Sequence, residues 1–217
     1  MNLKLKQNKK RDDKMNIFNV VGFFVVALAL SFLSGQDKKV EVGSVVPDFS
    51  LTDLNGKVVK LSDFKGKVVV LEWTNPNCPF VQRVYKEKIM PSVQKEFVQK
   101  GVVWIIINST NPKHKDYLEP KELQKIYNEW GSSYTAYLID PDGKVGKMFD
   151  AKTTPHMFVI NKDGKLVYNG AIDDDPRGEK KEKINYVKNA LSEILAGKPV
   201  SVSITKPYGC SVKYAEQ

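Results

Sequence analysis

The sequence has few residues of the kinds that carry out covalent or metal chemistry. It contains only two cysteines, Cys78 and Cys210, and two histidines, His114 and His156. No C-x-x-C pair and no H-x-x-x-H pair occurs, which argues against a structural zinc site. It also has no G-x-x-x-x-G-K-[ST] phosphate loop, no G-x-G-x-x-G after the first predicted strand and no G-x-S-x-G elbow. We therefore predict no metal and no cofactor, and Cys78 is left as the candidate reactive group.

The charge distribution does not indicate a nucleic-acid surface. The chain has 217 residues and a formal net charge of +9. Residues 1–36 hold six of the 34 basic residues and two of the 25 acidic ones, so the remainder has 28 basic and 23 acidic residues, intermixed. No basic stripe interleaved with aromatic residues occurs, so we predict no nucleic-acid partner. The acidic run 173–175 has no further ligand pattern and is interpreted as a solvated loop.

The first residues have the layout of an export signal. A lysine-rich stretch over 1–14 precedes an apolar run over 17–33 and a small, polar segment over 34–39. The apolar run is at the short end for a bilayer span, so residues 1–36 fit either a cleaved signal peptide or a retained membrane anchor. Positive charge before the apolar run favours export of the residues after it. We predict an extracytoplasmic protein, periplasmic after cleavage or anchored facing out, with membrane contact only through this segment.

The rest of the chain is predicted to be one domain over 37–199, followed by a tail over 200–217 that carries Cys210. Apolar runs of strand length alternate with segments whose apolar residues recur every three or four positions. This alternation predicts an α/β fold with a central mixed sheet flanked by helices and an N-terminal hairpin extension. The predicted elements are a hairpin over 47–61, strands over 68–73, 102–107 and 134–139, a hairpin over 157–168, and helices from Pro79 with a break at Pro91, from Pro120, and over 184–195.

Cys78 lies between a predicted buried strand and the helix that begins at Pro79. The N–H groups and dipole at a helix start stabilise a thiolate, which is the nucleophilic form of cysteine. Proline suits the first helical position because its missing N–H would be unpaired there in any case. The alternative interpretation is a buried cysteine that only caps the helix.

A second cluster, Thr153-Thr154-Pro155-His156, precedes a predicted strand. A proline that opens a strand can adopt a cis bond in a tight turn. Such a turn can meet the loop at the carboxyl end of a central strand at one edge of an open sheet, where sites form. An ordinary trans proline in a loop is the alternative.

Taken together, these segments resemble the thioredoxin-like superfamily, in the branch of redoxins related to alkyl hydroperoxide reductase and thiol-specific antioxidant proteins. The likeness covers residues 42–197. It includes segments 47–49 and 61–71 and the pair Thr154-Pro155, while 72–81 and 207–214 are similar to a peroxiredoxin-like subgroup of bacterial thioredoxin family proteins. The resemblance implies a thioredoxin-like fold and thiol redox chemistry, with Cys78 as the attacking cysteine and Thr154 and Pro155 against it.

The sequence departs from both patterns known in that superfamily. Thioredoxins carry C-x-x-C, whereas this chain has Cys78-Pro79-Phe80-Val81, in which Val81 replaces the second cysteine. Peroxiredoxins place a threonine three residues before the attacking cysteine, whereas Thr74 lies four before Cys78. Arg83 is a candidate for their activating arginine only by its nearness in sequence. The resemblance therefore implies thiol redox chemistry and does not by itself imply peroxidase activity.

The leading hypothesis is an exported thiol–disulfide oxidoreductase. In it Cys78 attacks, and Cys210 resolves the mixed disulfide. Glu72, six residues before Cys78, is a candidate to accept the thiol proton as a desolvated carboxylate, although a solvent-facing strand end is the alternative. The residues predicted to contact substrate are Trp73, Asn77, Pro79, Phe80 and His156.

Two other functions stay open at this point. In a thiol peroxidase, Cys78 would become a sulfenic acid that Cys210 resolves. A redox-inactive thioredoxin-fold binding module would explain the absence of a second cysteine at Val81. The predicted partners are a protein or small-molecule thiol, disulfide or peroxide substrate, and a reducing partner that the sequence does not identify.

Overall fold

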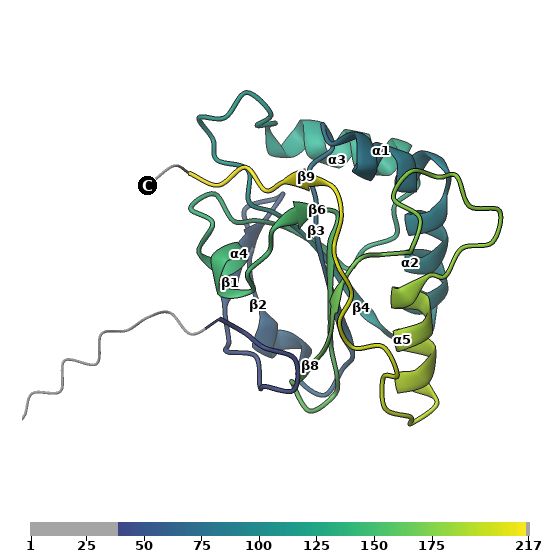
Figure 1. Cartoon of the computed structure of the whole chain (residues 1–217). Helices are drawn as coiled ribbons and strands as arrows, with labels where there is room; N and C mark the ends of the chain where they lie inside the picture. Colours follow the sequence, from purple (N-terminus) through teal and green to yellow (C-terminus); the bar gives the residue numbers. More distant parts are fainter. Residues whose placement is uncertain (1–38, 216–217) are drawn as a thin grey trace, which may run out of the picture. The chain divides into compact units, whose positions relative to one another are not determined.

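The computed structural model describes residues 39–215, which fold around a mixed sheet of seven strands in the order β2-β1-β5-β4-β3-β7-β8 (Figure 1). β4 runs parallel to β3 and β5, and the outer pairings are antiparallel. The predicted α/β fold is confirmed, including the N-terminal hairpin of β1 and β2. The strands are β1 (Ser50–Asp53), β2 (Val58–Lys60), β3 (Val69–Trp73), β4 (Val103–Asn108), β5 (Ala136–Ile139), β6 (Thr153–Thr154), β7 (His156–Ile160), β8 (Leu166–Gly170) and β9 (Cys210–Ser211).

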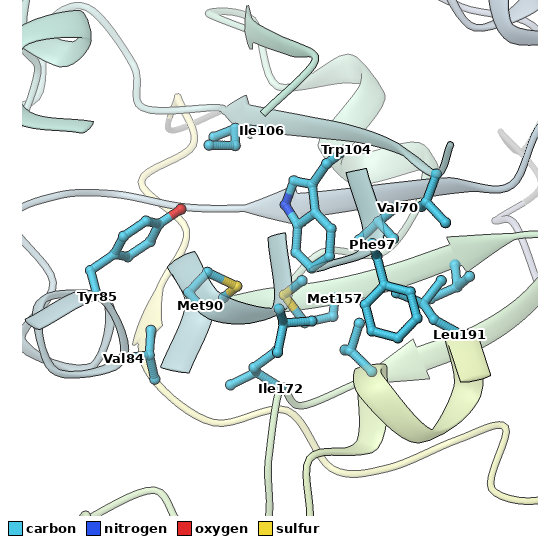
Figure 2. Close-up of a cluster of buried hydrophobic side chains, with 14 of the residues drawn as sticks. Val70, Val84, Tyr85, Met90, Phe97, Trp104, Ile106, Met157, Ile172 and Leu191 are labelled. Carbon is cyan, nitrogen blue, oxygen red and sulfur yellow. The ribbon is translucent and has the colours of Figure 1, made fainter. Parts of the chain in front are cut away.

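Helices cover both faces of the sheet. α1, α2, α3 and α5 contribute to the hydrophobic cluster on one face, and α4 packs with residues 40–49 on the other. Figure 2 shows part of the first cluster, in which Trp104 of β4 and Met157 of β7 lie near Met90 and Phe97 of α2. The helices are α1 (Pro79–Lys86), α2 (Ile89–Gln99), α3 (Pro120–Glu129), α4 (Lys144–Met148), α5 (Tyr186–Leu195) and the 3-10 helix η1 (Leu61–Phe64).

The central strands are almost entirely apolar because both of their faces are covered. All residues of β3 and β4 are buried. Along β3, Val70 faces the cluster formed with α1 and α2, whereas Leu71 and Trp73 face the cluster formed with α4. A strand buried on two sides is stabilised by apolar residues on both faces, which explains why 68–73 is a nearly continuous apolar run, interrupted only by Glu72.

The first predicted helix is two helices, and the predicted break at Pro91 is wrong. The break lies at Lys88, which has a left-handed φ of 58° between α1 and α2. Pro91 falls in the first turn of α2, where its missing N–H costs little because first-turn N–H groups have no intrahelical acceptor. The proline therefore marks the start of a helix after the break. The five-residue α4 was not predicted.

The C-terminal segment runs along the body of the domain. Residues 200–214, called here the C-terminal strap, pass β8 and return to β6 (Figure 1, yellow). Ile204 bridges to Asn169 of β8, and β9 pairs with β6. Beyond β9, the Val212 N–H donates to the Lys152 carbonyl oxygen at 3.1 Å. The strap therefore brings Cys210 back to the sheet.

The predicted signal peptide or anchor over 1–36 lies outside the described residues. Within residues 39–215, no helix combines the length and the apolar composition of a membrane span. The domain boundaries after residues 36 and 199 stay predictions.

Candidate active site

Cys78 is the N-cap residue of α1, at the end of the turn that connects β3 to this helix. Asn75 shapes this turn, because its carbonyl oxygen accepts the Cys78 N–H at 3.0 Å and its side chain accepts the Asn77 N–H at 2.8 Å. Pro79 occupies the first helical position, and the Gln82 N–H donates to the Cys78 carbonyl oxygen at 2.9 Å. Cys78 is only 2% exposed. A reaction partner therefore reaches its sulfur only if the groups that cover it move.

The turn at Thr154 and Pro155 lies against Cys78. The Thr154–Pro155 peptide bond is cis. The Cys78 thiol donates a hydrogen bond to the Thr154 carbonyl oxygen at 3.0 Å. The structure thus brings these three residues together, although 76 positions separate Cys78 from Thr154 in sequence.

The C-terminal strap occupies the backbone edge of this turn. β9 pairs antiparallel with β6, placing Ser211 opposite Thr153 and Cys210 opposite Thr154. The pairing brings the Sγ atoms of Cys78 and Cys210, both free thiols, to 2.8 Å from each other. Since a disulfide has about 2.05 Å between its sulfurs, only a small movement separates this arrangement from a bond.

Gly209 allows the strap to approach the turn so closely. Its φ of +134° lies in a region that L side chains rarely adopt. A Cβ atom at this position would lie 2.0 Å from the Thr154 carbonyl oxygen. Any residue other than glycine would therefore push the strap away from Thr154 and, with it, from Cys78.

Glu72 is buried on the same face of β3 as α1 and α2. Its carboxylate accepts hydrogen bonds from the Tyr85 hydroxyl at 2.7 Å, Gln94 Nε2 at 2.9 Å and Trp104 Nε1 at 2.8 Å. Burial raises the pKa of Glu72 to about 7, although these three donors act in the opposite direction. Glu72 is not a solvent-facing strand end. No hydrogen bond joins it to Cys78 in the part of the chain described, so proton transfer between them needs an intermediary.

The raised pKa of Glu72 predicts that folding stability falls as the pH rises. The folded-state pKa of about 7 lies above the usual 4.5, so at intermediate pH the unfolded chain has lost this proton while the folded chain keeps it. The stabilisation is complete below pH 4.5 and is lost as the pH rises through about 7, a change of about 3 kcal/mol. Urea unfolding of the wild type and of Glu72→Gln across this range measures it. A wild type whose stability parallels the variant's at every pH contradicts this expectation.

Trp73 is buried on the opposite face of the sheet from Glu72. It is 0% exposed, its ring packs against Phe149 and Phe158, and its Nε1 donates to Ser109 Oγ at 3.0 Å. The alternation of side chains along β3 sends Glu72 toward α1 and Trp73 away from it. Trp73 therefore points away from α1, and its contact with substrate stays a prediction.

His156 is also buried, and both of its ring nitrogens are occupied. Nδ1 accepts the Lys152 N–H at 3.2 Å, so Nε2 carries the proton and donates to Asn169 Oδ1 at 2.8 Å. Burial lowers the pKa of His156 to about 4, which keeps the ring neutral. The ring of His156 links the turn before β7 to β8, and its contact with substrate stays a prediction.

The other predicted substrate contacts lie nearer the surface beside the thiol. Asn77 and Pro79 are exposed. Phe80 is half-buried and packs against Tyr208 of the strap, with 5.9 Å between ring centroids. A substrate can touch these positions without entering the core.

Tyr208, which has no role predicted from the sequence, meets Arg83 and Asp173. The Tyr208 hydroxyl accepts from Arg83 Nη2 at 3.0 Å and donates to Asp173 Oδ1 at 2.5 Å. The sequence signal that could have pointed to Tyr208 is its position within 207–214, a segment that carries part of the family resemblance.

Asp173 and Asp175 are buried, so the interpretation of 173–175 as a solvated loop is wrong for two of its three residues. Within residues 39–215, no three His, Cys, Asp or Glu side chains cluster as metal ligands.

A thiol at a helix N-cap, after a central parallel strand and beside a cis-proline turn, defines a redoxin with a thioredoxin-like fold. The chain belongs to the AhpC/TSA family, whose model matches residues 42–169, more than half of its length.

The curated relatives are thiol–disulfide oxidoreductases. ResA of Bacillus cereus is 27% identical over 158 residues, covering 70% of this chain and 84% of the relative. ResA of Bacillus subtilis is 29% identical over 130 residues, covering 60% and 67%. The relatives confirm the predicted class, a thiol–disulfide oxidoreductase.

Solved structures confirm the thioredoxin-like fold. An uncharacterized conserved protein from Geobacillus kaustophilus has a TM-score of 0.73 at 30% identity, covering 82% of this chain and 94% of that one. A hypothetical protein from Sinorhizobium meliloti 1021 has a TM-score of 0.74 at 23% identity, covering 83% and 98%. At 23% identity, the similarity to the Sinorhizobium meliloti protein supports the fold and not a function.

Proposed function

We propose that this chain is a thiol–disulfide oxidoreductase in which Cys78 attacks the substrate and Cys210 resolves the intermediate. The observation that carries this proposal is the 2.8 Å between the two Sγ atoms, from residues 132 positions apart. Disulfide exchange needs a thiolate, a second thiol within reach of the mixed disulfide, and little else. In this chain Cys210 of the strap does what the second cysteine of C-x-x-C does in thioredoxins.

The reaction consists of two exchanges. The Cys78 thiolate attacks one sulfur of the substrate disulfide, forms a mixed disulfide and releases the other sulfur, which takes a proton from solvent. Cys210 then loses its proton and attacks the Cys78 sulfur, forming the Cys78–Cys210 bond and releasing the second substrate thiol. The substrate gains two electrons, and the two cysteines lose them. A thiol reductant restores both cysteines.

The environment of Cys210 sets the order of the two attacks. Burial, then the hydrogen bond to Cys78 and the negative charge of Cys78, raise the pKa of Cys210 to about 12. Cys210 is therefore protonated and unreactive while Cys78 is a free thiolate. A disulfide sulfur carries no charge, so the contributions from Cys78 disappear once the mixed disulfide has formed. The pKa of Cys210 then falls, although its burial remains, and Cys210 becomes more reactive than it was beside the Cys78 thiolate.

The neighbouring groups have supporting roles in this proposal. The Thr154 carbonyl oxygen and Pro155 orient the Cys78 sulfur, supported by the 3.0 Å hydrogen bond to Thr154. Glu72, whose pKa is about 7, accepts the Cys78 proton through an intermediary such as water. We propose that Asn77, Pro79 and Phe80 contact the substrate, which is supported by their position at or near the surface beside Cys78.

The partners in this proposal are a protein or small-molecule disulfide and a thiol reductant. The predicted export segment over 1–36 supports a reaction outside the cytoplasmic membrane, where disulfides form and persist. The ResA relatives are thiol–disulfide oxidoreductases, which supports the substrate class.

Stopped-flow oxidation by glutathione disulfide and by hydrogen peroxide, in separate runs, tests the function. Arg83 is hydrogen-bonded to Tyr208 and to the Asp175 carbonyl oxygen, and in the described residues no arginine is hydrogen-bonded to Cys78. We therefore expect glutathione disulfide to oxidise the chain faster than it oxidises a free thiol, and peroxide to react no faster than with a free thiol.

Cys210→Ser is the matched control in the disulfide run. It should keep the first exchange and retain glutathione on Cys78, whereas the wild type releases it. Rapid reaction with peroxide would instead indicate a thiol peroxidase. Failure of both oxidants to exceed the free-thiol rate would favour a redox-inactive binding module.

A further inference from the structure

We propose that Tyr208 is a positioning residue that holds Cys210 in line with Cys78, acting through Arg83. This inference rests on the proposed pairing of the two cysteines. α1 carries Cys78 at its N-cap and Arg83 further along the same helix. Tyr208 stands two residues before Cys210 in the strap. A bond between Tyr208 and Arg83 therefore ties the strap to the helix that carries the attacking sulfur.

The contacts of the Tyr208 hydroxyl are with charged groups that are themselves fixed. It accepts from Arg83 Nη2 at 3.0 Å and donates to Asp173 Oδ1 at 2.5 Å. Arg83 Nη2 also donates to the Asp175 carbonyl oxygen at 2.7 Å, and Nη1 to Glu87 Oε2 at 3.1 Å. The side chains of Arg83 and Asp173 are 13% and 1% exposed. Hydrogen bonds to charged groups in such a site are stronger than those between neutral groups.

The ring of Tyr208 also lies against α1. Its centroid is 5.9 Å from that of Phe80 and 6.0 Å from Arg83 Cζ. Tyr208 thus contacts the first and second turns of α1, the helix that has Cys78 at its N-cap.

The strap has a second anchor beyond Cys210, and that anchor is on another element. Tyr214 lies against α4, where a Cβ at Gly146 would be 2.4 Å from its hydroxyl oxygen. The hydroxyl donates to the Ala151 carbonyl oxygen at 2.8 Å. This anchor fixes the strap to the body of the domain but not to α1. Tyr208 is therefore a side-chain contact that ties the strap directly to the Cys78 helix, in addition to the backbone pairing of β9 with β6.

The contact of Tyr208 with α1 favours formation of the Cys78–Cys210 disulfide, because it lowers the conformational entropy that the strap loses when the bond forms. When Cys210 is already held beside Cys78, forming their disulfide orders little additional chain, so the effective concentration of the second thiol is high. Without the anchor, the strap must be ordered as the bond forms. The Cys78–Cys210 disulfide then forms more slowly and is easier to reduce.

The test compares the wild type with Tyr208→Phe, which removes only the hydroxyl. In glutathione buffers, we expect the equilibrium constant for the Cys78–Cys210 disulfide to fall about tenfold, or about 30 mV in reduction potential. In single turnover, Cys210 should attack the Cys78 sulfur of the glutathione adduct and release glutathione as a thiol about tenfold more slowly.

Tyr134→Phe is the matched control, because in the described residues no hydrogen bond is found for the Tyr134 hydroxyl. In the Tyr134→Phe variant, the equilibrium constant for the Cys78–Cys210 disulfide should stay within about twofold of the wild-type value. Asp173→Asn keeps an acceptor oxygen for Tyr208 and should shift the constant less than Tyr208→Phe does. Thermal unfolding of each reduced variant separates a general loss of stability from a change in redox equilibrium.

The outcomes distinguish this inference from the function on which it rests. A wild type that forms the Cys78–Cys210 disulfide, with Tyr208→Phe giving the same constant and the same release rate, contradicts the role of Tyr208 alone. A lower melting temperature without a shift in either redox quantity also contradicts it. A wild type that forms no such disulfide contradicts both the proposed function and this inference.

Discussion

Replacing Cys78 by Ser is expected to lower thiol–disulfide exchange by at least about a thousandfold, to the level of the buffer. The serine hydroxyl fits the space of the thiol and can donate to the Thr154 carbonyl oxygen as the thiol does at 3.0 Å. It is not ionised at neutral pH, so it cannot attack a disulfide. Cys210 does not substitute, because it lies in β9 and lacks the helix start that stabilises a thiolate at position 78.

The loss is measured as the rate at which the chain catalyses reduction of insulin by dithiothreitol. Cys210→Ser provides the comparison, since it keeps the attacking sulfur and still forms the mixed disulfide, which dithiothreitol instead of Cys210 then resolves. Far-ultraviolet circular dichroism confirms that both variants fold. A Cys78→Ser chain that retains the wild-type rate would show that the reactive group lies elsewhere.

Replacing Gly209 by Ala is expected to slow resolution of the mixed disulfide about a hundredfold. A methyl group there would lie 2.0 Å from the Thr154 carbonyl oxygen, where an ordinary contact needs at least 3.4 Å. That oxygen is a backbone atom rather than the end of a flexible side chain, so we expect the strap to move. Displacing one reacting group by about 1 Å is enough for a loss of this size. The rate of glutathione release from the Cys78 adduct measures it.

Gly43→Ala separates the steric effect from the cost of the backbone conformation. Gly43 also has a positive φ, +93°, but nothing lies within 4 Å of the position its Cβ would take. In both variants the new alanine must adopt a positive φ, which lowers the stability of the folded chain by about 1–2 kcal/mol. Only Gly209→Ala should slow resolution. Equal effects of the two substitutions would mean that the close approach at Thr154 does not matter for Cys210.

Local pattern was sufficient to predict much of the fold and the centre of the site. The apolar run over 68–73, the proline after Cys78 and the proline at position 120 each indicate an element through local physics, namely burial on two faces or an unpaired first-turn N–H. The juxtaposition of Cys78 with Thr154 could be predicted because it results from the topology of an open sheet.

The direction of side chains and the path of the strap could not be predicted from the sequence. Trp73 and Glu72 are neighbours, and only the register of β3 in the sheet decides which faces α1. His156 looks reactive in sequence, but its two hydrogen bonds come from residues that only the fold brings near. The contact of Tyr208 with Arg83 spans 125 positions, and no local pattern encodes such a distance.

The most direct measurement of the central claim is a disulfide map of the oxidised chain. The chain is oxidised with glutathione disulfide, its free thiols are alkylated, and it is digested without reduction for mass spectrometry. We expect one intramolecular link, between the peptide that contains Cys78 and the peptide that contains Cys210. Alkylation of both cysteines, or a Cys210–Cys210 link between two chains, would contradict the proposed pairing.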